Sequence, residues 1–162
     1  MIRSRLSQFT SPDAKIDRDT IRNVLDGANE DDFISLDRIA RDPKDPMWHL
    51  SLMALLVLRP DSAKPVVDDL IGTGDAVAAY TICGLIHDFG RSADVQILMR
   101  ILTVYDDGDV RLLAIHALAK IGDVSLIPFL ATISTTDSSR DFEGRATAKA
   151  ALDAIDQLQS RS

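Results

Sequence analysis

Four apolar segments of this chain carry the same arrangement of one leucine and two small residues. The small residues stand four positions and one position before the leucine, in the sets Ser51/Ala54/Leu55, Thr81/Gly84/Leu85, Ala114/Ala117/Leu118 and Ala148/Ala151/Leu152. The four leucines are 30, 33 and 34 positions apart. Small residues three positions apart share one helix face and let a neighbouring helix approach closely. Recurrence of that face at a nearly fixed period is typical of stacked helical repeats rather than of a domain with one central core.

The composition favours an all-α protein that binds a basic partner. Of the 162 residues, 46% are hydrophobic but only 5% are aromatic, a mixture that suits helix-on-helix packing. The net charge of −7 disfavours binding to nucleic-acid phosphates and to anionic membranes, because Lys and Arg drive such binding. An acidic surface instead speeds encounter with basic proteins. We therefore expect a protein partner, no membrane partner and little affinity for nucleic acid.

The sequence also suggests where the chain resides. Cys83 is the only cysteine, so neither an intrachain disulfide nor a cysteine-based zinc site can form. Polar residues follow the first five positions, where a secretory signal would be hydrophobic. The longest apolar stretch, 50–58, is too short to cross a bilayer. These features favour a cytoplasmic location.

Turn and capping residues divide the chain into helices. We expect the first helix of each repeat to open after an aspartate, namely Asp45, Asp75 or Asp109, because its carboxylate accepts free backbone N–H groups. Gly or Pro should end these helices at Arg59-Pro60, Phe89-Gly90 and Ile121-Gly122. A second, one-sided helix should then begin at Asp61, Ser92 or Asp123.

This pattern predicts one repeat domain over residues 1–162. Residues 1–14 would be a flexible N-terminus, 15–43 an atypical N-terminal cap repeat, 44–143 the core repeats and 144–158 a capping helix. The cap repeat would contain helices over 19–25 and 31–40. About four antiparallel helix pairs and one closing helix result. Terminal repeats often depart from the pattern because one of their faces has no neighbour.

One unit resembles a known repeat family. Its residues are Asp109-Val110-Arg111, Ala114, Ala117-Leu118, Ile121-Gly122-Asp123, Ile127-Pro128 and Leu130. They resemble a HEAT repeat of the short bacterial kind that also occurs in phycobilin lyase subunits, and segments 45–60, 75–90 and 145–155 match more loosely. The resemblance implies a short right-handed α-solenoid whose second helices line a concave surface. Arg111 and Arg145 correspond to Trp48 and Ala78 in the earlier units, so no ligand-binding pattern carries over.

Candidate partner-binding residues follow from that architecture. The second helices would place six polar side chains in the concave groove: Asp37, Arg41, Asp68, Asp69, Gln96 and Arg100. Asp106 and Asp107 form an acidic turn that would add to the attractive field. Trp48, the sole tryptophan, would be a binding anchor if exposed. The alternatives are ordinary polar faces and a Trp48 that covers a seam between repeats.

No residue pattern indicates catalysis, a cofactor or a metal. Cys83 and His87 are four positions apart, but Cys83 occupies a packing position, where a buried thiol is inert. His49, His87 and His116 differ in register and do not form one column. The acidic run 106–109 lacks the later ligands of a calcium loop.

We therefore expect a non-catalytic module that binds a protein through an acidic concave surface. Neutralising a basic partner, as the immunity protein of a bacterial toxin does, is one form of this hypothesis. A tetrapyrrole lyase subunit is the alternative that the repeat subtype suggests. A nucleic-acid-processing HEAT protein would require a basic groove, and Asp68 and Asp69 disfavour one.

Overall fold

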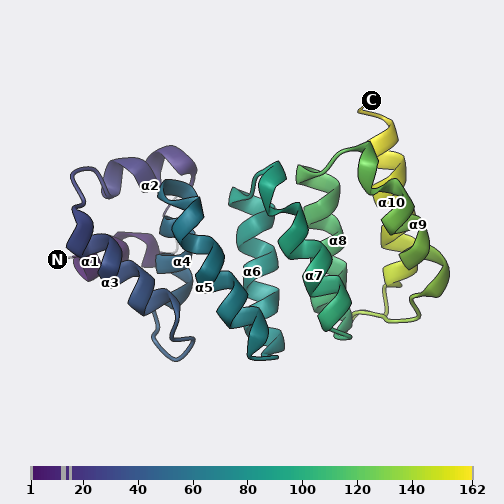
Figure 1. The fold of residues 1–162 in the computed structure, drawn as a ribbon, viewed down its shortest axis with the longest axis horizontal. Helices are drawn as coiled ribbons and strands as arrows, with labels where there is room; N and C mark the ends of the chain where they lie inside the picture. Colours follow the sequence, from purple (N-terminus) through teal and green to yellow (C-terminus); the bar gives the residue numbers. More distant parts are fainter. Residues whose placement is uncertain (1, 12–13, 15, 162) are drawn as a thin grey trace. The chain divides into compact units, whose positions relative to one another are not determined.

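The computed structural model describes residues 2–11, 14 and 16–161, and the regular elements within them are helices (Figure 1). No β-strand occurs in the described part of the chain, where a single bridge joins Arg140 to Ala146. The predicted all-α class is thus confirmed. None of the described helices is both long and apolar enough to span a membrane. The chain divides into two compact units, the first ending at Gly72 and the second beginning at Thr73.

The first unit is organised around a buried helix. Its elements are α1 (Ile2–Leu6), η1 (Ser7–Thr10), α2 (Arg18–Val24), α3 (Glu30–Ala40), α4 (Trp48–Leu58) and α5 (Pro60–Gly72). Helix α4 packs against α2, α3 and α5, and nine of its eleven residues are buried. A helix that is apolar all round is stable only in such a setting. Helices α3 and α5 also contact each other, and α1 lies against α3.

The N-terminal segment and the first residue of helix α4 differ from the sequence prediction. Residues 2–10, expected to be flexible, form α1 and η1, because Ile2, Leu6 and Phe9 supply an apolar face that the unit buries. Helix α4 begins at Trp48 with Met47 as its N-cap, whereas Asp45 was expected to cap it. The Asp45 carboxylate accepts the Met47 N–H at 3.0 Å, so it stabilises the turn before the helix.

The second unit contains α6 (Ala76–Phe89), η2 (Ser92–Asp94), α7 (Val95–Val104), α8 (Gly108–Ile121), η3 (Val124–Leu126), α9 (Ile127–Thr136) and α10 (Thr147–Gln159). Helix α8 packs against both α6 and α10, α7 lies against α8, and α9 lies against α10 (Figure 1). The predicted ends at Gly90 and Gly122 are the observed C-caps. At Gly122 a Cβ would lie 2.7 Å from the Leu118 carbonyl oxygen, so glycine is required there.

Capping aspartates begin α6 and α8, but one of them is not the residue expected. Asp75 caps α6, as predicted, by accepting the N–H groups of Val77 at 2.8 Å and Ala78 at 3.2 Å. Asp107, not Asp109, caps α8, because the helix begins at Gly108, two residues before the start at Val110 that a cap at Asp109 would give. Asp109 is thereby left in the first helical turn, with its carboxylate available to another segment.

The recurring leucine face is buried in two of its four occurrences. Its three members are fully buried in α4 and again in α8. In α6, Gly84 and Leu85 are only half-buried, since that helix turns Ile82, Cys83 and Ile86 inward. In α10, Leu152 is 52% exposed. Helix α10 is the last helix described, and it packs on α8 and α9 through the face that contains Ala151.

Candidate protein-binding site

The second unit has a hollow lined by exposed apolar side chains, which we call the Phe142 pocket. It measures about 350 Å³ and is lined by Ala76, Val77, Tyr80, Asp107, Asp109, Val110 and Phe142. Val77 is 74% exposed, Tyr80 49% and Phe142 87%. Isolated exposed hydrophobic residues are common on proteins, but several gathered in one hollow mark a surface that another molecule can cover.

Two helix starts and one loop build this pocket. The Asp75 cap fixes the first turn of α6, and Val77 and Tyr80 stand three positions apart on one face of that helix. Phe142 lies in the loop 137–146 between α9 and α10. Its backbone N–H donates to the Asp109 carboxylate at 3.1 Å, which ties the loop to the first turn of α8.

Gly108 allows the loop to lie this close to α8. A Cβ added at Gly108 would lie 1.8 Å from the carbonyl oxygen of Arg140 and 2.3 Å from its carbonyl carbon. Both atoms belong to backbone, which cannot rotate aside as a flexible side chain can. Glycine at this position is therefore a requirement of the contact that positions the segment carrying Phe142.

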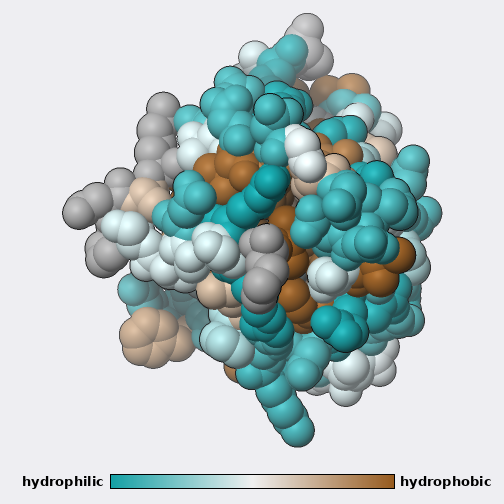
Figure 2. Space-filling model, turned by 90° about the vertical axis from the view of Figure 1, so that its left-hand side faces the viewer, coloured by the Kyte–Doolittle hydropathy of each residue, from teal (hydrophilic) through white to brown (hydrophobic). Residues whose placement is uncertain are grey.

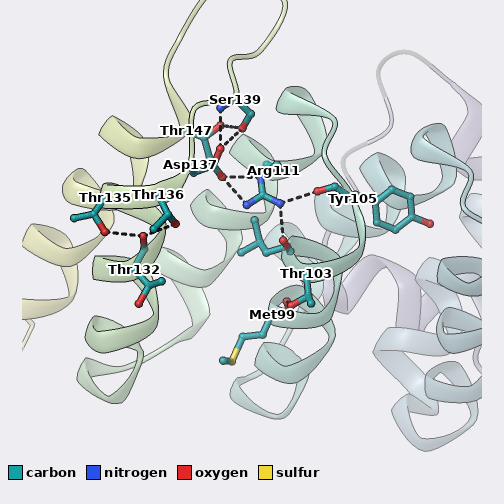
Figure 3. Close-up of polar contacts among 11 residues, drawn as sticks. Met99, Thr103, Tyr105, Arg111, Thr132, Thr135, Thr136, Asp137, Ser139 and Thr147 are labelled. Carbon is teal, nitrogen blue, oxygen red and sulfur yellow. Dashed lines mark hydrogen bonds and ion pairs between the residues drawn. The ribbon is translucent and has the colours of Figure 1, made fainter.

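Arg111 anchors the start of the same loop. Its Nε donates to the carboxylate of Asp137 at 2.7 Å, and its Nη1 donates to the carbonyl oxygens of Leu102 at 2.5 Å and Tyr105 at 2.7 Å. Figure 3 shows the guanidinium between Asp137 and the backbone near Tyr105. Asp137 is the C-cap of α9 and Tyr105 the C-cap of α7, so Arg111 on α8 binds the C-terminal ends of both helices. Cations at helix C-termini satisfy carbonyls that lack an intrahelical donor.

Asp137 also organises the next residues of the loop. Its carboxylate accepts the N–H of Ser139 at 2.8 Å and the hydroxyl of Ser139 at 2.6 Å. The Ser139 hydroxyl lies 2.8 Å from that of the buried Thr147 on α10 (Figure 3). Burial by itself raises the pKa of Asp137, but the hydrogen bonds from Ser139 and Arg111 and the charge of Arg111 outweigh it, so this pKa lies below its ordinary value. The carboxylate is therefore ionised at neutral pH.

The surroundings of the pocket are acidic. The second unit carries twelve Asp and Glu residues against eight Lys and Arg. Asp107 and Asp109 line the pocket. Within the described residues, only the Oδ1 atom of each accepts a hydrogen bond, from the Val110 N–H at 3.0 Å and from the Phe142 N–H, respectively. The Asp109 carboxylate also acts on Arg145. The hydrogen bond with Asp141 raises the pKa of Arg145 most, and the charge of Asp109 raises it further. Arg145 itself is held by Asp141 and Glu143.

Three of the residues predicted from the sequence lie together in the first unit. Arg41 on α3 donates from Nε to the Asp37 carboxylate at 2.8 Å and pairs through Nη1 with Asp69 on α5. The pKa of Arg41 is raised, chiefly by the hydrogen bond with Asp37. Asp68 is half-buried beside this group. Because the Arg41 guanidinium already pairs with carboxylates on α3 and α5, it has fewer N–H groups to donate to a partner.

The other predicted residues lie apart. Trp48 is only 9% exposed and stands edge-on to His49, with ring centroids 6.2 Å apart, so it is not the exposed anchor considered above. Gln96 and Arg100 are exposed on α7, and Asp106 is exposed beside the pocket. Asp107 is the only one of the predicted residues that lines the Phe142 pocket.

The pocket's apolar members were missed by sequence reasoning. Val77 and Tyr80 lie on a helix whose periodicity does not distinguish the buried face from the exposed one. Phe142 carried a usable signal, because it is an aromatic residue alone among the polar residues of 134–145.

Cys83 and His87, considered above as a reactive pair, lie in surroundings that do not activate the thiol. Cys83 is fully buried, and desolvation raises the pKa of its thiol to about 12, so it holds no reactive thiolate. His87 places Nδ1 2.8 Å from the Asp88 carboxylate on the same helix. Within the described ranges no group of three or more His, Cys, Asp or Glu residues is arranged to hold a metal ion.

A smaller hollow in the first unit holds a cation of its own. It measures about 230 Å³, and Glu30, Phe33, Ile34 and Arg59 are among its lining residues. The Arg59 guanidinium carbon lies 3.8 Å from the centroid of the Phe33 ring, and its Nη1 lies 2.7 Å from a Glu30 oxygen. Figure 2 shows hydrophobic residues at the surface bounded by hydrophilic ones. In this hollow the ring of Phe33 and the carboxylate of Glu30 together bind the guanidinium of Arg59.

Comparison of the chain with family models, with curated proteins and with solved structures finds no match.

Proposed function

We propose that this chain is a protein-binding module whose Phe142 pocket and acidic surroundings bind a basic protein. The observation that carries the proposal is the coincidence, in one hollow, of three exposed apolar side chains with two carboxylates. Such an arrangement supplies both parts of a protein interface. Apolar and aromatic contacts set the residence time, and complementary charge accelerates encounter.

The proposal includes a repeat architecture of the HEAT type. Successive packing of α6, α8 and α10, with α7 and α9 on neighbouring helices, supports a short α-solenoid in the second unit. The role of Arg111 supports it further, because one side chain on α8 binds the ends of α7 and α9, which are successive second helices of the proposed stack. Helical repeat proteins commonly bind other proteins, and loops at the ends of their helices add contacts.

The rigid setting of the pocket favours binding. Arg111, Gly108 and Asp109 each fix part of the loop 137–146, so a partner would meet a formed surface. Pre-organised side chains lose less conformational entropy on association. Neutralisation of a basic toxin is one form that this binding would take.

The test is a comparison of variants by affinity capture. The chain is immobilised, exposed to native lysate of its source organism at low salt, and the proteins retained in stoichiometric amount are identified by mass spectrometry. Phe142→Ala removes an anchor with an exposed ring and should weaken binding by at least 10-fold, as for an interface hot spot. Leu152→Ala removes another exposed apolar residue, 52% exposed and outside the pocket, and should change binding less than 3-fold.

The identity of the retained protein and its response to salt complete the test. The proposal expects a basic protein whose capture weakens as salt rises, since exposed charges are screened. Equal capture by Phe142→Ala and the unchanged chain, or an acidic partner insensitive to salt, would contradict the proposal.

A further inference from the structure

The Phe142 pocket contains the groups that receive a positively charged side chain, and no Lys, Arg or His is among its lining residues. Tyr80 and Phe142 supply aromatic rings, and Asp107 and Asp109 supply carboxylates. The Oδ1 atom of each aspartate accepts a backbone N–H, which orients the carboxylate. No hydrogen bond to either Oδ2 is found in the part of the chain that the structure describes.

The first unit shows what such a set of groups does. Around Phe33, the ring and the Glu30 carboxylate hold the guanidinium of Arg59, at 3.8 Å from the ring centroid and 2.7 Å from the carboxylate oxygen. Cations stack on aromatic faces because the ring's quadrupole is negative there. The Phe142 pocket has the same two kinds of group on a larger scale, with two rings, two carboxylates and about 350 Å³ of space.

We propose that the Phe142 pocket binds the cationic side chain of an arginine or lysine presented by the partner protein, an inference that rests on the proposed function. The aliphatic stem would pack against Val77 and the two rings, while the charged head meets Asp107 and Asp109. Lys and Arg are suited to this because their stems are apolar and only their heads are charged.

A purely apolar occupant fits the pocket less well. Covering Asp107 and Asp109 with an apolar side chain would strip water from two ionised carboxylates without replacing its hydrogen bonds, and that is costly. An anionic occupant would meet a repulsive field, because the second unit has four more acidic than basic residues. A cationic head avoids both costs.

The test uses capped peptides as probes of the full chain. Alanine pentapeptides with acetyl and amide ends carry arginine, lysine, citrulline or norleucine at the centre, so the four probes differ only in head group. Binding is followed by NMR through the backbone amide shifts of Val77, Tyr80, Val110 and Phe142. The arginine and lysine peptides should shift these amides with dissociation constants in the millimolar range, and the neutral citrulline and norleucine peptides should bind at least 5-fold more weakly.

Charge-removing variants separate the pocket from the general acidity of the chain. Asp107→Asn/Asp109→Asn removes two charges and keeps side-chain acceptors for the Val110 and Phe142 N–H groups, since Asn is also a good N-cap. Asp123→Asn/Asp156→Asn removes two charges outside the pocket. The first pair should abolish the preference for arginine over citrulline, and the second should preserve it.

The outcomes distinguish this inference from the proposed function. If the arginine peptide shifts none of the four amides, or binds no better than citrulline, the inference is wrong. If Phe142→Ala still weakens capture of a basic protein in that case, the proposed function stands without it. If the peptides bind as expected but capture is indifferent to Phe142→Ala, the pocket binds cations and the proposed function fails.

Discussion

Replacing Arg111 by methionine should destabilise the second unit strongly. The Arg111 side chain is 12% exposed and makes an ion pair with Asp137, whose side chain is 6% exposed. Its guanidinium also donates to the carbonyl oxygens of Leu102 and Tyr105. Methionine preserves much of the stem volume, so the loss is mainly polar. Removing one partner of a buried pair costs about 3–5 kcal/mol. The two unsatisfied carbonyls account for part of that cost, at about 1–3 kcal/mol for each one that water does not reach.

The measurement is urea unfolding followed by circular dichroism at 222 nm. We expect Arg111→Met to lower the free energy of unfolding by about 3–5 kcal/mol and the melting temperature by about 10 °C. The control is Arg22→Met, because Arg22 pairs with Asp19 on the surface, with side chains 53% and 85% exposed, and should cost less than about 0.5 kcal/mol.

A double-mutant cycle isolates the pair from the carbonyl contacts. The variants are Arg111→Met, Asp137→Asn and both together, and the two residues should show a coupling energy of about 1–3 kcal/mol. If Arg111→Met lowers the free energy of unfolding by less than about 1 kcal/mol, the view that this side chain joins the ends of α7 and α9 is refuted.

Four further predictions follow from particular residues. Gly108→Ala should displace the loop that carries Phe142, because its Cβ would lie 1.8 Å from the Arg140 oxygen, and NMR shifts confined to other regions would contradict this. Asp137 has a lowered pKa in the folded state, so its stabilising effect is complete above the unfolded pKa of about 3.9 and is lost as pH falls through the lower folded value. The stability difference between the unchanged chain and Asp137→Asn should therefore shrink as pH falls below about 3.9, and a difference that stays constant with pH would contradict this. Ser51→Ala should raise stability by about 1 kcal/mol in urea unfolding, because the Ser51 hydroxyl is buried and no partner for it is found among the described residues. Cys83 should resist iodoacetamide until the protein unfolds, since burial raises its pKa to about 12, and fast labelling of the folded chain would exclude this packing.

Helix ends were predictable wherever a single residue type decides them. Gly90 and Gly122 end α6 and α8 where expected, because each is crowded by the preceding turn in a way that excludes a side chain. The Asp75 cap was also predicted correctly. At α8, both Asp107 and Asp109 are good N-caps, and propensity alone did not choose between them.

The burial of the recurring leucine face depended on neighbours that the sequence does not specify. Leu55 and Leu118 are fully buried, but the equivalent Leu152 is half-exposed on the last described helix. Periodicity shows that a helix has an apolar face; it does not show whether another helix covers that face.

The candidate site was predictable only in part. Asp107 was selected for its charge, and its capping role and position at the pocket follow from the fold. Phe142, Tyr80 and Asp109 come together from three segments far apart in the chain, so no local pattern could join them. The Asp37–Arg41–Asp69 cluster was predicted as a set of groove contacts, and its members pair with one another across α3 and α5.

The most direct test of the proposed function is site-specific photo-crosslinking. The chain is produced in its own host with p-benzoylphenylalanine in place of Phe142, and separately in place of Leu152, which is also exposed but lies outside the pocket. We predict that Phe142→p-benzoylphenylalanine forms one dominant adduct with a basic protein and that Leu152→p-benzoylphenylalanine does not. The same adducts at both positions, or none at position 142, would contradict the proposal that this pocket is where the partner binds.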